Sequence, residues 1–182
     1  MTAVATVLIT GLSGTGKSSA LTELASLGHR VVDTDDAGWR EYHPAPDPTD
    51  PVHQGEWLWV EDRIAELLDT EDDRSLFVSG CVRNQSVFAD RFEAVVLFDA
   101  PLDTMLDRVA GRTTNPYGKS AVERAMIEAD HREVLPLLRA SCTHVLDASR
   151  PLHDVVADLV AIASFADRGG DGDGGRTGGA RP

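Results

Sequence analysis

The stretch GLSGTGKSS, from Gly11 to Ser19, constrains the fold of this chain more than any other part of the sequence. It follows the apolar, β-branched run AVATVLI (Ala3 to Ile9), which is typical of a buried parallel strand. Apolar residues then recur at helical spacing as far as Leu27, and Gly28 ends the pattern. The sequence therefore predicts a strand, a glycine-rich loop and a helix in direct succession.

This loop matches the pattern G-x-x-x-x-G-K-[ST] at Gly11, Gly16, Lys17 and Ser18. Glycines let successive backbone N–H groups point at phosphate oxygens, and the helix N-terminus adds its positive dipole end. We expect Lys17 to reach the β- and γ-phosphates of a nucleoside triphosphate and the Ser18 hydroxyl to ligate Mg²⁺. The candidate nucleotide-binding residues here are Gly11, Ser13, Gly14, Thr15, Gly16, Lys17, Ser18 and Ser19.

Strand-like runs alternate with helical or irregular sequence along the rest of the chain. These runs are HRVVD, SLFVSG, AVVLFDA and THVLDA. The alternation predicts an α/β protein with a parallel sheet covered by helices on both faces. We expect one helix to begin near Pro101, and another near Pro151 that buries Leu152. A third helix is predicted from Glu56 to Leu68.

Length and composition set the remaining bounds. The 182 residues predict one domain over 1–166, followed by a glycine-rich tail (167–182) too poor in apolar residues to fold. A net charge of −13 argues against nucleic-acid and membrane partners, and a monomer or homodimer is expected. The sequence shows neither a membrane-spanning run nor a signal-peptide pattern, so we expect a cytoplasmic protein.

Three features together resemble a known family: the loop GLSGTGKS, the acidic DTDD after the second strand, and a late polar loop bearing arginine. They resemble the P-loop small-molecule kinases of the shikimate kinase, gluconate kinase and adenylate kinase group, from about Ala3 to Ala163. The resemblance implies a five-stranded parallel sheet of order 2-3-1-4-5, with ATP and Mg²⁺ as cofactors. It also implies a substrate-binding insertion at 37–69 and a mobile lid at 111–120.

The resemblance gives roles to the aspartates after the second strand. Asp33 and Asp35 lie where α/β sheets place their ligands, and they correspond to a D-x-D that holds the metal shell and the acceptor hydroxyl. Asp33 is thus a candidate metal residue beside Ser18, and Asp35 a catalytic and substrate-binding one. Alternatively, these aspartates and Asp36 cap a turn or helix. Asp99 is a further open candidate for Mg²⁺, although it fits the start of a helix equally well.

The late loop DRVAGRTTNPYGKS resembles the lid of this group. The resemblance casts Arg108 as the neighbour of adenine, with a solvated helix face as the alternative, and Arg112 as the catalytic lid arginine. Lys119 either assists or contacts solvent. Ser149 and Arg150, in DASRP, fall where the family's adenine-contacting loop follows the last strand, and Ser149 also fits a helix cap.

The acceptor side of the site is harder to define from sequence. Trp59 and Arg63, one turn apart on the predicted helix, could line an acceptor pocket, or Trp59 could simply cover the sheet edge. Arg83, in SGCVRNQ after the third strand, is a candidate for gripping an anionic group, because its planar fork matches a carboxylate or phosphate.

These residues point to an ATP-dependent phosphotransferase that moves the γ-phosphate to a hydroxyl or phosphate of a small molecule. Lys17, Asp33, Asp35 and Arg112 are its expected catalytic residues. Two alternatives stay open at this point. One is a nucleoside or nucleotide kinase, and the other is an ATP-hydrolysing P-loop switch that acts through a partner. A polynucleotide end kinase would need a basic groove, which the net charge disfavours.

Overall fold

The computed structural model describes residues 4–46 and 55–169, the side chains of 167–169 excepted. Fourteen elements follow one another along these ranges. They are β1 (Thr6–Thr10), α1 (Lys17–Ser26), β2 (Arg30–Asp33), β3 (Arg40–His43), β4 (Glu56–Trp59), α2 (Glu61–Asp69), β5 (Leu76–Ser79), the 3₁₀ helix η1 (Arg83–Arg91), β6 (Ala94–Asp99), α3 (Leu102–Gly111), α4 (Ala121–Glu133), α5 (Leu135–Ser141), β7 (His144–Asp147) and α6 (Leu152–Gly169).

Five of the strands form one parallel sheet in the order β2-β5-β1-β6-β7. Counted without the separate β3–β4 pair, this is the predicted order 2-3-1-4-5. The carboxyl ends of all five strands therefore meet at one edge, where the loops after β1, β2, β5, β6 and β7 come together. The α/β fold with a parallel sheet is confirmed.

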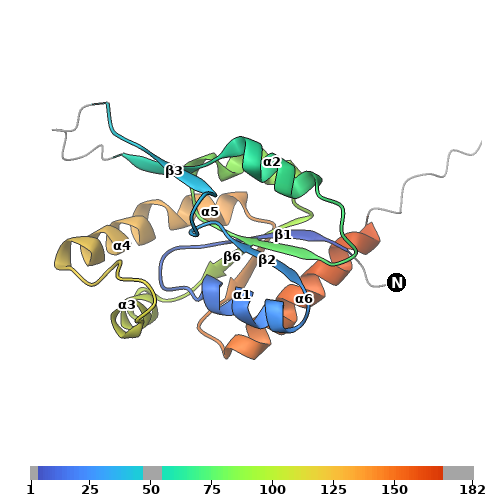
Figure 1. The fold of residues 1–182 in the computed structure, drawn as a ribbon. Coiled ribbons are helices and arrows are strands. Elements are labelled where there is room, and N and C mark those ends of the chain that lie inside the picture. Colours follow the sequence, from blue (N-terminus) through green and yellow to red (C-terminus); the bar gives the residue numbers. More distant parts are fainter. Residues whose placement is uncertain (1–3, 47–54, 170–182) are drawn as a thin grey trace, which may run out of the picture.

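Helices cover both faces of this sheet, with α1 and α6 on one face and α2 and α5 on the other (Figure 1). Side chains of β1 point alternately to the two faces of the sheet. Val7 and Ile9 pack in the core under α1 and α6, and Leu8 packs in the core that contains Trp59 and Ile64. Burial of these apolar faces is what holds the three layers together.

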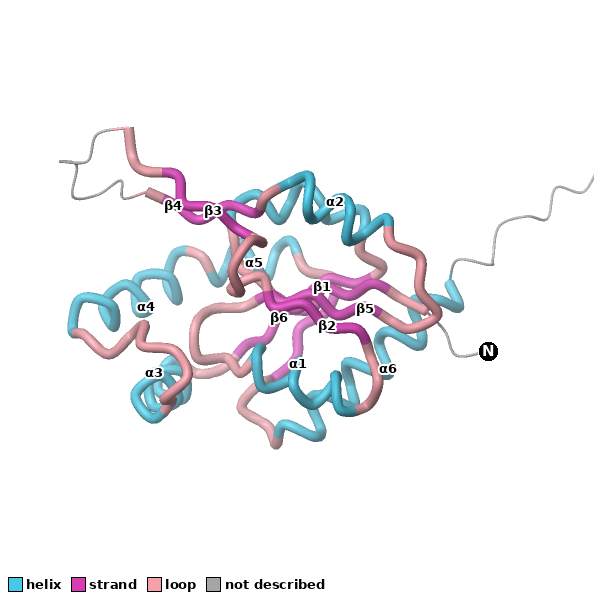
Figure 2. Tube along the Cα trace, in the orientation of Figure 1, coloured by secondary structure: helices cyan, strands magenta, loops and turns pink. Residues whose placement is uncertain are grey.

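The predicted helix from Glu56 to Leu68 was wrong in its first third. Residues Glu56–Trp59 form β4, which pairs antiparallel with β3 in a two-stranded hairpin set apart from the main sheet (Figure 2). The helix α2 begins only at Glu61. The run EWLW is rich in strand-favouring aromatics, and its pairing partner Arg40–His43 lies beyond the range of local helical spacing.

Two smaller expectations near the C-terminus also fail. Leu152, predicted to be buried, is the first residue of α6 and is 38% exposed. The helix α6 continues to Gly169, three residues into the predicted tail, while the rest of that tail (170–182) lies outside the described residues. Among the helices described, none is long and apolar enough to cross a membrane.

Candidate active site

The loop between β1 and α1 packs closely against α3. Gly14 has a φ of 88°, and a Cβ at this position would lie 2.5 Å from the Met105 carbonyl oxygen in α3. A side chain is therefore excluded both by backbone conformation and by space. The predicted strand, glycine-rich loop and helix are all present, with α1 beginning at Lys17.

The Lys17 ammonium lies against the loop itself. It donates hydrogen bonds to the carbonyl oxygens of Gly11 at 2.5 Å and Leu12 at 3.1 Å. The Thr15 hydroxyl also donates to Leu12 O, at 2.8 Å, and is buried. Lys17 is thus held at the mouth of the loop, where a phosphate oxygen would compete with these carbonyls for its donors.

Ser18 and Asp33 form the clearest polar pair of the site. The Ser18 hydroxyl donates to Asp33 Oδ2 at 2.7 Å, which joins the start of α1 to the end of β2. The other carboxylate oxygen of Asp33 accepts the Asp35 backbone N–H at 3.1 Å. A hydroxyl and a carboxylate are the oxygen donors that Mg²⁺ prefers, so these two side chains fit the predicted metal site.

Two arginines of the α3 region reach the loop from the opposite side. Arg108 Nη1 donates to Thr15 O at 3.3 Å, and Arg112 Nη2 donates to Ser13 Oγ at 3.1 Å and to Tyr117 O at 2.8 Å. Partial burial lowers the pKa of Arg112, and the negative charge of Asp35 opposes that shift. The Arg112 guanidinium therefore contacts the glycine-rich loop through the Ser13 hydroxyl.

The hairpin brings the side chain of Arg40 to Asp35. Arg40 in β3 forms an ion pair with Asp35, Nη1 to Oδ1 at 2.8 Å, and its Cζ lies 4.8 Å from the centre of the Trp57 ring. The Trp57 ring also packs against Tyr42, with 5.4 Å between ring centres. Arg40 lies in the predicted substrate-binding insertion (37–69), but its contacts depend on a strand pairing that was not predicted.

Trp59 does not line an acceptor pocket. It is 1% exposed, packs against Phe88, and donates from its indole nitrogen to Thr34 Oγ1 at 2.9 Å. Thr34 in turn donates to Ser79 O at 2.7 Å. Because its ring has no accessible face, we withdraw Trp59 as a substrate-binding residue. The exposed tryptophan on the same face of the hairpin is Trp57, which is 48% exposed.

The two predicted acceptor cations, Arg63 and Arg83, are less buried than Trp59. Arg63 in α2 donates to Gly38 O at 3.0 Å, and its Cζ lies 4.9 Å from the Trp39 ring centre. Arg83 forms an ion pair with Glu56, with 3.4 Å between Nε and Oε2, and its side chain is 81% exposed. Both cations therefore stay near the hairpin, and neither is committed to a buried partner.

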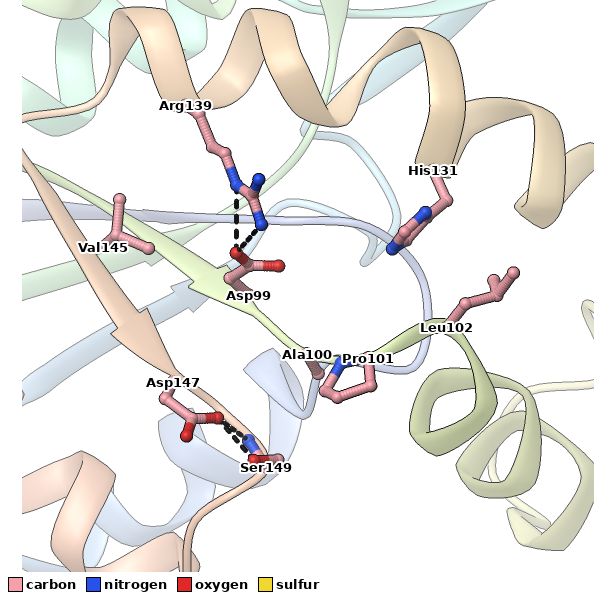
Figure 3. Close-up of a pocket in the computed structure, with 9 residues that line it drawn as sticks. All are labelled: Asp99, Ala100, Pro101, Leu102, His131, Arg139, Val145, Asp147 and Ser149. Atoms are coloured by element: carbon pink, nitrogen blue, oxygen red, sulfur yellow. Dashed lines mark hydrogen bonds and ion pairs between the residues drawn. The ribbon is translucent and has the colours of Figure 1, made fainter.

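Asp99 is engaged elsewhere. Its carboxylate accepts from Arg139 of α5, with 3.1 Å between Nε and Oδ2. The pair lines an open cavity of about 620 Å³ at the ends of β6 and β7, into which His131 also points (Figure 3). The Ser18 hydroxyl donates to Asp33 and not to Asp99. Of the aspartates considered for the metal, Asp33 is therefore the one whose carboxylate lies beside Ser18.

The loop after β7 is held by its own hydrogen bonds. The Ser149 hydroxyl and backbone N–H both donate to Asp147, which lowers the pKa of that carboxylate, with smaller contributions from Arg150 and Arg108. Arg150 pairs with Asp158 on α6. The Ser149 side chain turns to Asp147 rather than to α6.

The site has two sides. The nucleotide side is the loop 11–19 with Asp33, Arg108 and Arg112. The acceptor side is Asp35, Arg40, Tyr42, Trp57, Arg63 and Arg83.

The sheet order, the glycine-rich loop before α1 and the residues around it define a P-loop NTPase fold. Solved structures share this architecture. The shikimate kinase from Acinetobacter baumannii, in complex with shikimate, superposes with a TM-score of 0.58 at 16% identity, covering 87% of this chain and 92% of that one. The shikimate kinase from Bacteroides thetaiotaomicron gives 0.56 at 15% identity, covering 87% and 97%. A gluconokinase from Sinorhizobium meliloti 1021 gives 0.53 at 19% identity, covering 91% and 94%.

At the level of sequence, a family described as an AAA domain matches residues 7–134. The chain belongs to this family. The matched range runs from β1 through α4, so it contains the phosphate-binding loop, Asp33, the hairpin and the 112–120 loop. A comparison with curated proteins found no match.

Proposed function

We propose that this protein is an ATP-dependent phosphotransferase that moves the γ-phosphate of ATP to a hydroxyl or phosphate of a small anionic molecule. The observation that carries the proposal is the chain of contacts from Ser18 to Asp33, Asp35 and Arg40, which joins the phosphate-binding loop to the hairpin. A site for hydrolysis alone has no need of a second, cationic surface at this position. The fold shared with shikimate kinases and a gluconokinase is consistent with this reading.

On the nucleotide side, Lys17 and the backbone N–H groups of its loop bind the β- and γ-phosphates. Ser18 and Asp33 hold Mg²⁺, which when bound neutralises charge on the phosphate oxygens. Arg112 stabilises the negative charge that spreads over the γ-phosphoryl oxygens as the bond to the β-phosphate breaks.

On the acceptor side, Asp35 orients the attacking hydroxyl and accepts its proton as the new P–O bond forms. Arg40, paired with Asp35, binds an anionic group of the acceptor, and the three cations Arg40, Arg63 and Arg83 set the charge that the acceptor must carry. A sugar acid, a hydroxy acid or a phosphorylated metabolite meets this requirement.

A nucleotide acceptor is the second candidate. The Trp57 ring is 48% exposed and packs at a tilted angle against Tyr42, with Arg40 over the ring, so it offers an aromatic surface on which a base can stack. This support replaces Trp59, which is buried. The two candidates differ in what they require: a nucleoside monophosphate needs the ring of Trp57, whereas a sugar acid needs the charge of Arg40.

The test is ATP consumption by the purified protein, alone and with panels of sugar acids, hydroxy acids, nucleosides and nucleotides, with the Lys17→Ala protein as control. A compound that stimulates ADP release and gains a phosphate establishes the transferase and its acceptor class. Turnover that depends on Lys17 but that no compound stimulates would replace this proposal with the ATP-hydrolysing switch.

A further inference from the structure

Lys119 is bound to the C-terminal end of α3. Its ammonium donates to three carbonyl oxygens: Val109 at 2.8 Å, Ala110 at 2.6 Å and Arg112 at 2.7 Å. An ammonium has three N–H donors, so these contacts use all of them. The last carbonyls of a helix have no partner within the helix and lie at the negative end of its dipole. Lys119 therefore satisfies the end of α3 and leaves no donor for a phosphate.

Arg112 is held at both ends by this arrangement. Lys119 holds its carbonyl, and its guanidinium donates to Ser13 Oγ in the phosphate-binding loop and to Tyr117 O. Its Nε is buried without a hydrogen-bond partner among the described residues. A buried donor without an acceptor costs free energy, which a bound anion would offset. Arg112 thus faces the phosphate site before any nucleotide binds.

The turn that returns Lys119 to α3 is itself fixed. Gly118 has a φ of 88°, and a Cβ there would lie 2.2 Å from Val109 Cγ1. The Glu123 carboxylate accepts the backbone N–H groups of Gly118 and Ser120. The loop 112–120 is consequently tied to α3 on one side and to α4 on the other.

We propose that Lys119 is a positioning residue that aims Arg112 at the phosphate-binding loop without touching the nucleotide, so that this lid is preformed. The inference rests on the proposed function, since it concerns the γ-phosphate of the same nucleotide. The chain has two lysines against fifteen arginines, yet it carries a lysine here. Three convergent carbonyls suit a compact ammonium, whereas the planar fork of arginine suits carboxylates and phosphates.

The first test measures ATP and ADP affinity by calorimetric titration in the presence of Mg²⁺. The proteins are wild type, Lys119→Met, Arg112→Met and the double variant, with Arg132→Met as a control that removes one exposed cation from α4. The preference for ATP over ADP reports the γ-phosphate contact. Lys119→Met is expected to reduce this preference roughly tenfold, and the double variant to match Arg112→Met alone, because the two residues act as one unit.

A direct phosphate contact by Lys119 predicts a different result: the losses from Lys119→Met and Arg112→Met multiply in the double variant, which overturns the proposal. Lys119→Arg provides a second check. It keeps the charge but not the three-carbonyl geometry, so it is expected to behave like Lys119→Met. Wild-type preference in Lys119→Arg contradicts the positioning role.

Amide hydrogen exchange without nucleotide tests, independently of function, whether the contacts of Lys119 fix the 112–120 loop. Lys119→Met is expected to speed exchange in residues 112–120 while α1 and the sheet keep their protection, which also shows that the variant folds. Unchanged exchange in the loop overturns the inference. If the wild-type protein binds no ATP, the proposed function fails, and the exchange result still decides whether Lys119 fixes the loop.

Discussion

Arginines serve both sides of the site, but the structure holds them in different ways. On the nucleotide side, Arg108 and Arg112 donate to backbone and hydroxyl oxygens of the loops they touch. On the acceptor side, Arg40 pairs with the Asp35 carboxylate and lies over the Trp57 ring, and Arg83 is largely exposed. Arg63 lies over the Trp39 ring and is the one of the three that also donates to a backbone carbonyl, that of Gly38. Backbone partners fix a position, whereas exposed side-chain partners can be exchanged for those of a ligand. We therefore expect the nucleotide side to be preformed and the acceptor side to be completed when the acceptor binds.

The largest effect is expected from Lys17→Ala, on the nucleotide side. Its ammonium lies at the mouth of the loop and is the cation nearest the expected phosphates. Loss of a donor aimed at transition-state charge typically lowers kcat about 10²- to 10³-fold. Steady-state ADP release measures this, with thermal unfolding as the check that the fold is intact. Near-normal turnover would remove the phosphate role of Lys17.

Arg40→Gln probes the acceptor side. It removes the ion pair with Asp35 while leaving the phosphate-binding loop untouched. We expect the KM for the acceptor to rise by about tenfold, the loss typical of one charge-assisted hydrogen bond, while the KM for ATP stays constant. Arg132→Gln, on an exposed position of α4, is the matched charge control. An equal rise in both KM values would erase the distinction between the two sides.

Thr34→Val tests the buried hydrogen bonds that join Trp59 of the hairpin to the main sheet. Thr34 is fully buried and links Trp59 to the end of β5, so the valine leaves the indole N–H and the Ser79 carbonyl without this partner. We expect a loss of about 1–3 kcal/mol in the free energy of unfolding, measured by urea denaturation. Thr70→Val, at an exposed position, is expected to change stability by less than about 0.5 kcal/mol. Equal losses in the two variants would contradict the account of Thr34.

The smallest effect is expected from pH, through the contribution of Glu123 to stability beside the lid. Hydrogen bonds from Ser120, by its backbone N–H and its hydroxyl, lower the pKa of Glu123, with a smaller contribution from Gly118. A lowered folded pKa means that the stabilisation is present above the ordinary carboxyl pKa and is lost as the pH falls through the folded value. The unfolding temperatures of wild type and Glu123→Gln should therefore differ at neutral pH and converge in acid. A constant gap across this range would contradict the assignment.

The sequence predicted the backbone of the nucleotide side, the strand, glycine-rich loop and helix, because that arrangement depends on local order. A glycine-rich loop between a strand and a helix has few conformations, and the strand alternation fixed the sheet on which Asp33 lies. The acceptor side was predicted poorly. Local spacing made EWLW look helical, and nothing local reveals that it pairs with REYH, or that Trp59 is buried while Trp57, on the same face of the strand, is exposed. The roles of Asp99 and Lys119 likewise depend on contacts with α5 and α3.

The central claim is that Ser18 and Asp33 hold Mg²⁺ with the nucleotide. The most direct measurement is titration of ATP into wild type and Asp33→Asn, each with Mg²⁺ and with EDTA. The account predicts that wild type binds ATP more tightly with Mg²⁺, and that Asp33→Asn retains the weaker Mg²⁺-free affinity but loses most of the Mg²⁺ enhancement. Equal affinity with and without Mg²⁺ in wild type, or an undiminished enhancement in Asp33→Asn, would contradict it.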